Sequence, residues 1–135
     1  MSTAHNNQRH PVEKSWSIQS DVSARGFDWP DISGVFAKVR EELAEIEHAW
    51  TTGDREHAKR ELGDLLFAAV NLARFLDADP SAELDHANGR FLRRFMLLEQ
   101  ELTREGRRVE QCTLAELDAV WDRIKHTIPD TLPRE

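Results

Sequence analysis

The chain has 135 residues, of which 39% are hydrophobic and 32% are charged, and its formal net charge is −7. This length suits one globular domain with its own core and is short for two domains. The acidic balance argues against a nucleic acid polymer as ligand, because its phosphate backbone would be repelled. Cys112 is the only cysteine, which excludes an intramolecular disulfide and a cysteine-rich zinc site.

The two ends of the chain are predicted to lie outside the folded part. Residues 1–14 are polar and aperiodic, so we expect a flexible N-terminal tail. The folded domain is predicted to cover residues 15–128, followed by a short tail at 129–135. No apolar run is long enough to span a bilayer, and the first residues lack the apolar segment of a signal peptide. We therefore expect a cytoplasmic protein with no membrane partner.

The first half of the chain predicts a short amphipathic segment and two long helices. The segment covers about residues 16–24 and leads to a turn-like sequence at 25–30. Asp31 is a good capping residue for a first long helix that ends at Gly53. Asp54 is the corresponding cap for a second long helix, which continues to about Leu76.

The second half predicts two further helices. Asp79 followed by Pro80 is a typical helix start, and this third long helix continues to about Arg104. Thr113 and Glu116 have the spacing of a capping box, which opens a final helix. No segment alternates like a strand. The sequence therefore predicts an all-α fold, a bundle of four main helices joined by short loops.

Glu42 stands out in the first long helix because it interrupts an apolar stripe. It lies seven residues after Val35 and seven before Ala49, both core-facing positions. Glu45 flanks Glu42 on the same side, whereas Glu47 is predicted to face outward. A solvated glutamate would not be expected in such a position.

The second long helix is apolar on nearly all sides, which predicts burial on nearly all sides. Its polar residues Glu61, Asp64 and Asn71 lie along one line of the helix surface. An alternative places Glu61 and Asp64 on exposed first turns, paired with Lys59 or Arg60. The apolar surface of this helix exceeds what one thin bundle can cover, so we also expect a homodimer or homotetramer.

Together the two helices supply four carboxylates in two pairs, each with a spacing of three residues, so each pair shares a helical face. Four acidic groups in a largely buried place repel one another and need a counter-charge. Mg²⁺ is the natural cation for oxygen ligands, and a magnesium cluster in a small protein points to phosphate chemistry. The four residues are Glu42, Glu45, Glu61 and Asp64.

An ordered series of motifs extends this observation across residues 16–126. The motifs occupy residues 26–31, 38–45, 61–67, 70–74, 88–91 and 93–95. Their acidic residues follow the order E-E-x-x-E, a gap, and E-x-x-D. The series resembles the MazG family of nucleoside triphosphate pyrophosphohydrolases, most closely the C-terminal catalytic domain of its two-domain members. The resemblance implies Mg²⁺-dependent hydrolysis of an NTP or dNTP to the monophosphate and pyrophosphate, with Mn²⁺ as a substitute cation.

The resemblance also implies roles for individual residues. The four carboxylates become the magnesium ligands, and Glu41 or Glu45 becomes the general base that activates water. Arg90 stands where close family members tend to have lysine, and His57 where some carry lysine. The implied substrate-binding residues are Lys38, Asn71, Arg90, Arg94, Trp121 and Lys125.

Several alternatives remain at this point. The arginines of the third long helix also fit a solvated basic face, and Trp121 also fits a core stripe with Val120 and Ile124. A ferritin-like di-metal protein would use E-x-x-H pairs, which occur at residues 45–48 and 83–86. A non-catalytic helical dimerisation module is a further candidate. Within the same superfamily, phosphoribosyl-ATP, dUTP or dCTP are alternative substrates.

Overall fold

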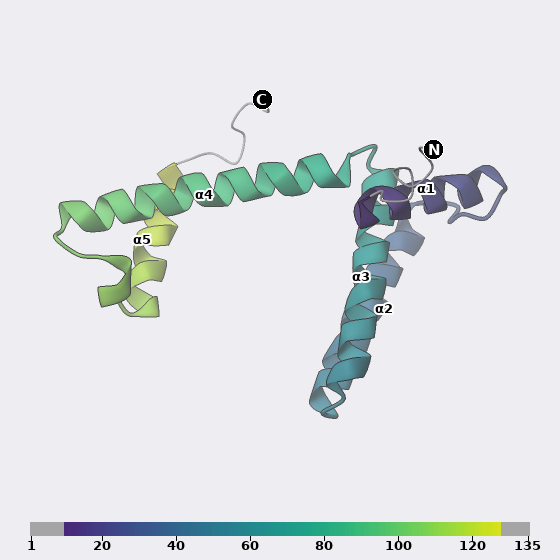
Figure 1. Ribbon diagram of the computed structural model, residues 1–135, viewed down its shortest axis with the longest axis horizontal. Helices are drawn as coiled ribbons and strands as arrows, with labels where there is room; N and C mark the ends of the chain where they lie inside the picture. Colours follow the sequence, from purple (N-terminus) through teal and green to yellow (C-terminus); the bar gives the residue numbers. More distant parts are fainter. Residues whose placement is uncertain (1–9, 128–135) are drawn as a thin grey trace, which may run out of the picture. The chain divides into compact units, whose positions relative to one another are not determined.

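The computed structural model describes residues 10–127, and these residues form helices joined by turns (Figure 1). The all-α prediction is therefore confirmed. The elements are α1 (Pro11–Ala24), α2 (Ile32–Thr51), α3 (Arg55–Phe75), α4 (Pro80–Arg104), the short 3-10 helix η1 (Val109–Gln111) and α5 (Leu114–Thr127).

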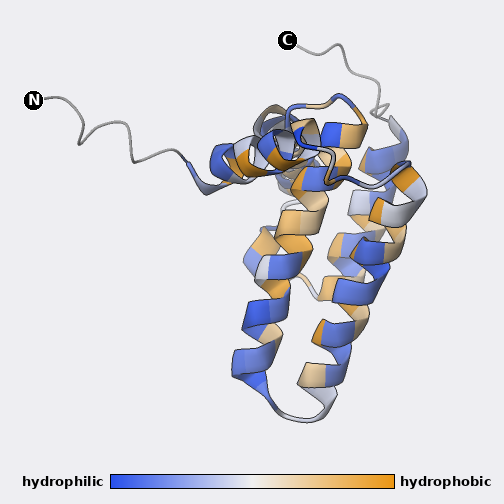
Figure 2. Cartoon of the chain, turned by 90° about the vertical axis from the view of Figure 1, so that its right-hand side faces the viewer, coloured by the Kyte–Doolittle hydropathy of each residue, from blue (hydrophilic) through white to orange (hydrophobic). Residues whose placement is uncertain are grey.

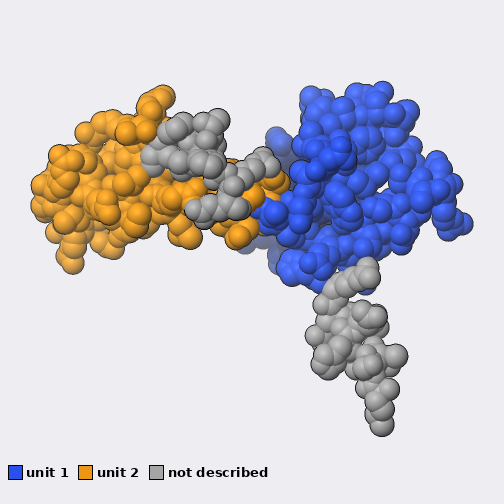
Figure 3. Space-filling view, turned by 90° about the horizontal axis from the view of Figure 1, so that it is seen from above, with its two compact units in different colours: residues 1–82 blue, residues 83–135 orange. Residues whose placement is uncertain are grey.

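The chain divides into two compact units, residues 1–82 and residues 83–135, which Figure 3 shows in different colours. Unit 1 contains α1, α2 and α3, and unit 2 contains α5 and most of α4. The four main helices of the prediction are α2 to α5. Their assembly into one bundle stays a prediction.

The α2–α3 pair is the largest element of unit 1 and begins and ends as the sequence predicts. Asp31 caps α2 by accepting a hydrogen bond from the backbone N–H of Ser33, at 2.8 Å. Gly53, with a φ of +80°, allows the sharp turn after α2. Asp54 then caps α3 by accepting from the N–H of His57 at 3.0 Å. The two helices therefore lie antiparallel and side by side (Figure 1).

Helix α1 begins earlier than predicted, at Pro11 instead of about residue 16. Proline is favoured in the first turn of a helix, and His10 Nδ1 caps this turn by accepting from the N–H of Val12 at 3.4 Å. Residues 11–14 of the predicted tail are therefore helical. The rest of that tail and the predicted C-terminal tail lie outside the described residues.

The prediction that the second long helix is buried on nearly all sides is wrong for this chain. Within unit 1, α3 packs against α2 and α1. These two neighbours bury Ala68 and Val70 but leave Leu62, Leu66 and Leu76 between 48% and 60% exposed. The cartoon of the helical pair changes repeatedly between hydrophobic and hydrophilic colours along its length (Figure 2).

Unit 2 has its own core between α4 and α5. Asp79 opens α4 by accepting from the N–H of Ser81 at 3.0 Å. Thr113 and Glu116 form the predicted cap of α5, with the Glu116 N–H 3.2 Å from Thr113 Oγ1. The buried residues of this core are Leu98, Leu102, Val120 and Ile124. Among residues 10–127, every helix is too short or too polar to cross a bilayer.

Candidate functional site

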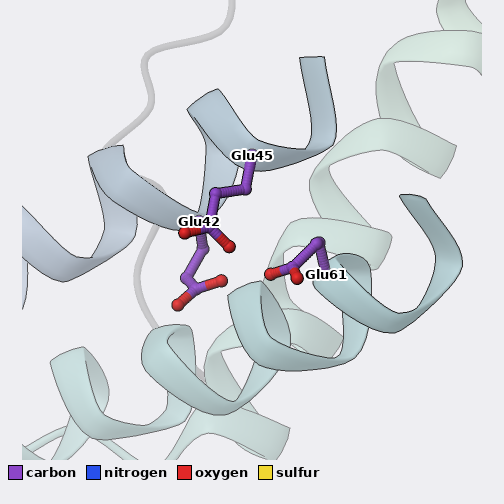
Figure 4. Close-up of side chains that lie close together, drawn as sticks. All are labelled: Glu42, Glu45 and Glu61. Atoms are coloured by element: carbon purple, nitrogen blue, oxygen red, sulfur yellow. The ribbon is translucent and has the colours of Figure 1, made fainter. Parts of the chain in front are cut away.

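Three of the predicted carboxylates meet between α2 and α3. Glu42 and Glu45 extend from α2, Glu61 extends from α3, and their side chains point toward one another (Figure 4). One carboxylate oxygen from each residue lies within 4.8 Å of the other two. The antiparallel packing of the two helices therefore brings together acidic groups that are 16 or more residues apart in sequence.

The burial of this cluster makes a bound cation chemically reasonable. Glu42 is only 4% exposed, as its position in the apolar stripe predicts. Glu42 Oε2 and Glu61 Oε2 are buried and have no hydrogen-bond partner among the described residues. Such oxygens are costly to leave unpaired, and a hard divalent cation prefers ligands of this kind. The residues present therefore fit Mg²⁺.

Lys38 is the main positive charge at the cluster. Its Nζ lies 3.1 Å from Glu42 Oε1 and 3.4 Å from Glu41 Oε2. Hydrogen bonding to Glu42 raises the pKa of Lys38, so the ammonium group is charged at neutral pH. One lysine does not balance three carboxylates, so the site retains an excess of negative charge.

The excess charge is reflected in how the carboxylates titrate. Hydrogen bonds to Glu45 and Glu42, together with burial, raise the pKa of Glu61 from 4.5 to about 7. Hydrogen bonding from Glu61, and then from Lys38, lowers the pKa of Glu42. The close approach of the three acidic groups therefore makes Glu61 harder to deprotonate when no cation is bound.

His57 contacts the cluster, although the sequence indicated it only as a departure from the lysine of some family members. Its Nε2 lies 3.0 Å from Glu61 Oε1, and this contact opposes the rise in the pKa of Glu61. The available signal was the spacing of four residues on one helix, which places His57 beside Glu61. The ring can therefore orient the Glu61 carboxylate through this contact.

Two of the predicted acidic residues lie outside the three-carboxylate group. Asp64 is exposed and, like Glu42, lines the groove described below. Glu41 is about half-exposed and pairs with Lys38. The proposed ligand role of Asp64 and the proposed catalytic role of Glu41 stay predictions.

A groove of about 680 Å³ follows α3 and is lined by Glu42 of the cluster. Its lining is mainly apolar, with Glu42, Asp64 and Lys38 at one part of the wall. A mostly apolar hollow with a few polar groups is typical of small-molecule sites. The remaining lining residues are Ile18, Gln19, Val22, Phe27, Asp28, Trp29, Val35, Phe67, Ala68, Asn71 and Arg74.

Trp29 reaches the groove from the loop before α2, and Gly34 makes room for it. A Cβ atom at Gly34 would lie 2.5 Å from Cε3 of the Trp29 ring. Any larger residue at position 34 would therefore displace the tryptophan. The close approach of the ring to α2 fixes one wall of the groove.

The other predicted substrate residues belong to unit 2. Arg90 and Arg94 are partly buried on α4, and Lys125 is exposed on α5. Trp121 packs against the unit 2 core, and its ring centroid lies 5.2 Å from that of Phe91. Trp121 thus lies beside the core, as the core alternative expects, and a contact of these four residues with substrate stays a prediction.

The ferritin-like alternative finds no support in the site. Across residues 10–127, the group of side chains able to share a cation consists of Glu42, Glu45 and Glu61. His48 is exposed on α2 and is not part of it. The cluster thus contains oxygen ligands alone, which suits magnesium better than the E-x-x-H pairs of a di-iron site.

Comparisons with known proteins agree with this geometry. Residues 32–95, which include the cluster, match the family model of the MazG nucleotide pyrophosphohydrolase domain. The chain is 40% identical over 108 residues to the nucleoside triphosphate pyrophosphohydrolase/pyrophosphatase MazG of Thermotoga maritima, covering 80% of this chain and 41% of that protein. It is 35% identical over 114 residues to the nucleoside triphosphate pyrophosphohydrolase of Escherichia coli K12, covering 83% and 43%.

The chain thus spans less than half the length of these two relatives. The part that matches carries the acidic motifs, the helical pair and the carboxylate cluster described above. The chain therefore carries a MazG nucleotide pyrophosphohydrolase domain, and residues 32–95 place it in the MazG family.

Proposed function

We propose that this chain hydrolyses nucleoside triphosphates, either NTPs or dNTPs, at the bond between the α and β phosphates. The products are a nucleoside monophosphate and pyrophosphate. The observation that carries this proposal is the cluster of Glu42, Glu45 and Glu61, whose buried member Glu42 also lines a groove of small-molecule size. The names of the two relatives above support the same reaction.

Magnesium is the proposed cofactor, with manganese as a substitute. Glu42, Glu45 and Glu61 would hold it, with Asp64 as the fourth ligand from the groove wall. A bound divalent cation would neutralise charge on the triphosphate and make phosphorus more open to attack. The unpartnered oxygens of Glu42 and Glu61 support a cation at this place.

The chain's own side chains supply the remaining parts of the reaction. A water oxygen forms a bond to phosphorus, the bridging P–O bond breaks, and pyrophosphate leaves with the bonding electrons. Glu45 or Glu41 accepts the proton of this water as general base. Glu45 is supported by its place in the cluster, and Glu41 by its position beside Lys38.

Cationic side chains are proposed to bind the phosphates. Lys38 lies at the cluster and lines the groove, so a substrate phosphate can replace its present carboxylate partners. Arg90 and Arg94, four residues apart on α4, are proposed to stabilise the leaving pyrophosphate. Trp121 and Lys125 complete the proposed nucleotide contacts.

A homodimer or homotetramer is proposed on the basis of exposed apolar side chains. Phe36, Leu43 and Trp50 recur every seven residues along α2 and are 40% to 62% exposed. Leu62 and Leu66 form a similar line on α3. Lines of this kind are typical of helices that pack against further helices. Light scattering after size-exclusion chromatography would test this, and a monomeric mass would contradict it.

The nucleotide substrate also suggests where the protein acts. We place the reaction in the cytoplasm, where nucleoside triphosphates are available, and propose removal of unwanted nucleotides from the pool as its purpose. A helical dimerisation module without activity is the second candidate. It is less well supported, because it gives no reason to bury Glu42 and Glu61 together.

The decisive experiment is a screen of the purified chain against NTPs and dNTPs with millimolar Mg²⁺. Pyrophosphate and inorganic phosphate are quantified separately. We expect pyrophosphate and the monophosphate. Release of inorganic phosphate with a diphosphate would place the attack at the γ phosphorus and refute the proposed reaction. If neither pyrophosphate nor phosphate is released from any nucleotide, the dimerisation module is favoured.

A further inference from the structure

Gln19 and Glu42 are the two buried polar residues among those described, and both line the groove. Gln19 is 4% exposed and comes from α1. Its Nε2 donates a hydrogen bond to the backbone carbonyl of Phe67, at 3.0 Å. A carbonyl oxygen can only accept, so the amide must present its nitrogen to Phe67 and its oxygen elsewhere.

The oxygen of Gln19 is consequently held in place without a partner. Gln19 Oε1 is buried and makes no hydrogen bond within residues 10–127. Gln19 and Phe67 both line the groove. A buried acceptor of this kind costs stability unless water or a ligand donates to it.

A second amide in the groove is fixed in the opposite sense. Arg74 donates to Asn71 Oδ1 through Nε at 3.1 Å and through Nη2 at 2.9 Å. Arginine has donors only, so Asn71 must turn its oxygen toward Arg74 and its Nδ2 donors away. Arg74 is itself held by Asp28, whose Oδ1 accepts from Nη2 at 2.6 Å. The Nδ2 hydrogens of Asn71 have no partner in the described part of the chain.

Asn71 and the carbonyl that anchors Gln19 lie at neighbouring places along α3. Phe67, which anchors Gln19, precedes Asn71 by four residues, or about one helical turn. Asn71 follows Asp64 by seven residues, so it lies about 10 Å from it along the helix axis. A nucleotide with its phosphates at the carboxylates would thus place its base near the amides.

The walls between the amides suit a flat aromatic ligand. Phe27, Trp29 and Phe67 line this groove and are each more than 40% exposed. Aromatic side chains of this kind stack on nucleobases. The groove therefore offers stacking surfaces, one fixed acceptor and one fixed donor.

We propose that Gln19 Oε1 and Asn71 Nδ2 read the edge of the nucleobase, Gln19 accepting from an N–H of the base and Asn71 donating to a base acceptor. This rests on the proposed function, because it takes a nucleotide as the ligand of the carboxylate site. Arg74 and Asp28 are positioning residues, since they set which atom of Asn71 faces the base.

Binding of nucleoside monophosphates, which the proposed reaction does not consume, tests this inference. Calorimetry on the full chain with Mg²⁺ compares pairs that differ by one donor. The pairs are AMP with purine riboside monophosphate, GMP with IMP, CMP with its 2-pyrimidinone analogue, and UMP with 3-methyl-UMP. In at least one pair, the natural nucleotide should bind about 5- to 150-fold more tightly, the range expected for a buried unsatisfied acceptor.

Two variants separate base reading from a structural role. Gln19→Met keeps the buried length but removes the acceptor, and the Phe67 carbonyl retains its bond within α3. This variant should lose the preference within the pair. Asn71→Asp still accepts from Arg74 but removes the donor, so it should bind every natural monophosphate more weakly and retain the preference. Gln100→Met, on the exposed surface of α4, is the matched control and should behave as wild type.

The inference is overturned if the wild-type chain distinguishes no pair, or if Gln19→Met weakens both members of a pair equally. If Asn71→Asp and wild type bind the natural monophosphates with equal affinity, Asn71 does not contact the base. Pyrophosphate release is measured separately on the triphosphates. Its absence would refute the proposed reaction, whereas the monophosphate affinities decide on base reading independently.

Discussion

Arg74 and Asp28 are 46 positions apart in sequence, yet Arg74 Nη2 lies 2.6 Å from Asp28 Oδ1. This ion pair ties the loop before α2 to the groove side of α3. Asp28 also accepts from Ser23 Oγ at 2.6 Å and from the N–H of Trp29 at 2.8 Å. One carboxylate thus fixes the loop that carries the Trp29 wall of the groove.

The first prediction concerns the pH dependence of this ion pair. Hydrogen bonds from Arg74 and then Ser23 lower the pKa of Asp28 from 3.8 to about 2. A carboxyl group with a lowered folded pKa stabilises the protein above its unfolded pKa, and this contribution is lost as pH falls from about 4 to 2. We expect Asp28→Asn to lower the unfolding free energy by about 1–2 kcal/mol at pH 6, allowing for partial exposure.

Urea unfolding at several pH values measures this effect. The difference between wild type and Asp28→Asn should shrink as pH falls toward 2. Asp21→Asn, at an exposed position of α1, is the control and should have little effect. A difference that stays constant from pH 6 to pH 2 would show that Asp28 does not act through its charge.

The second prediction concerns the carboxylate cluster. Glu42→Gln, Glu45→Gln and Glu61→Gln each remove a charge and keep the volume, so the helical fold should persist. Pyrophosphate release should fall at least about 100-fold, because charge stabilisation by a bound cation is worth several kcal/mol. Glu47→Gln, at an exposed position of α2, should be nearly silent. Full activity in two of the three cluster variants would exclude the proposed metal centre.

Asp64→Asn tests whether Asp64, which lies outside the three-carboxylate group, is also a magnesium ligand. If it is, the variant should lose activity, and a higher Mg²⁺ concentration should partly restore it. Activity equal to wild type at low Mg²⁺ would remove Asp64 from the proposed ligand set.

The third prediction links magnesium to pH. The raised pKa of Glu61, about 7, means that the folded cation-free protein binds a proton more tightly than the unfolded chain. This contribution to stability is therefore present below about pH 4.5 and is lost as pH rises through 7. Mg²⁺ competes with that proton, so the rise in melting temperature between chelator and millimolar Mg²⁺ should be larger at pH 8 than at pH 6. A melting temperature that does not increase with Mg²⁺ at either pH would contradict a metal site.

The fourth prediction concerns Lys38. Lys38→Met keeps the aliphatic stem but removes the charge that pairs with Glu42. We expect pyrophosphate release to fall about tenfold or more in kcat/KM, as expected for losing a charge-assisted contact to phosphate. Arg40→Met, exposed on the same helix, serves as the control. Equal kinetics for the two variants would mean that Lys38 does not bind substrate.

The fifth prediction concerns the arginines of unit 2. Arg94→Ala should lower kcat/KM about ten- to a hundredfold, because a bidentate contact to phosphate is worth roughly 1.5–3 kcal/mol. Arg107 lies in the turn after α4 and pairs with Glu105 and Glu116. Arg107→Ala should therefore leave activity unchanged. If the two variants have the same activity, the phosphate role of α4 must be abandoned.

Local features of this protein were predictable from the sequence because neighbouring residues decide them. Asp31 and Asp54 cap the helices that they were expected to cap, since each cap bonds to an N–H two or three residues away. Glu42 is buried as the apolar periodicity of α2 indicates. The acidic motifs likewise identified the family, because they lie at fixed spacings along two helices.

Contacts between distant segments depended on the tertiary structure. Periodicity places Glu61 and Asp64 on one face of α3, but the packing of α2 against α3 brings Glu61, and not Asp64, into the three-carboxylate group. The exposure of Leu66 likewise depends on which helices cover α3. The pairs Gln19–Phe67 and Asp28–Arg74 join segments more than 40 residues apart, and no local pattern specifies such partners. Helical spacing alone fixes which residues share a face, whereas the packing of the elements decides which atoms on that face meet.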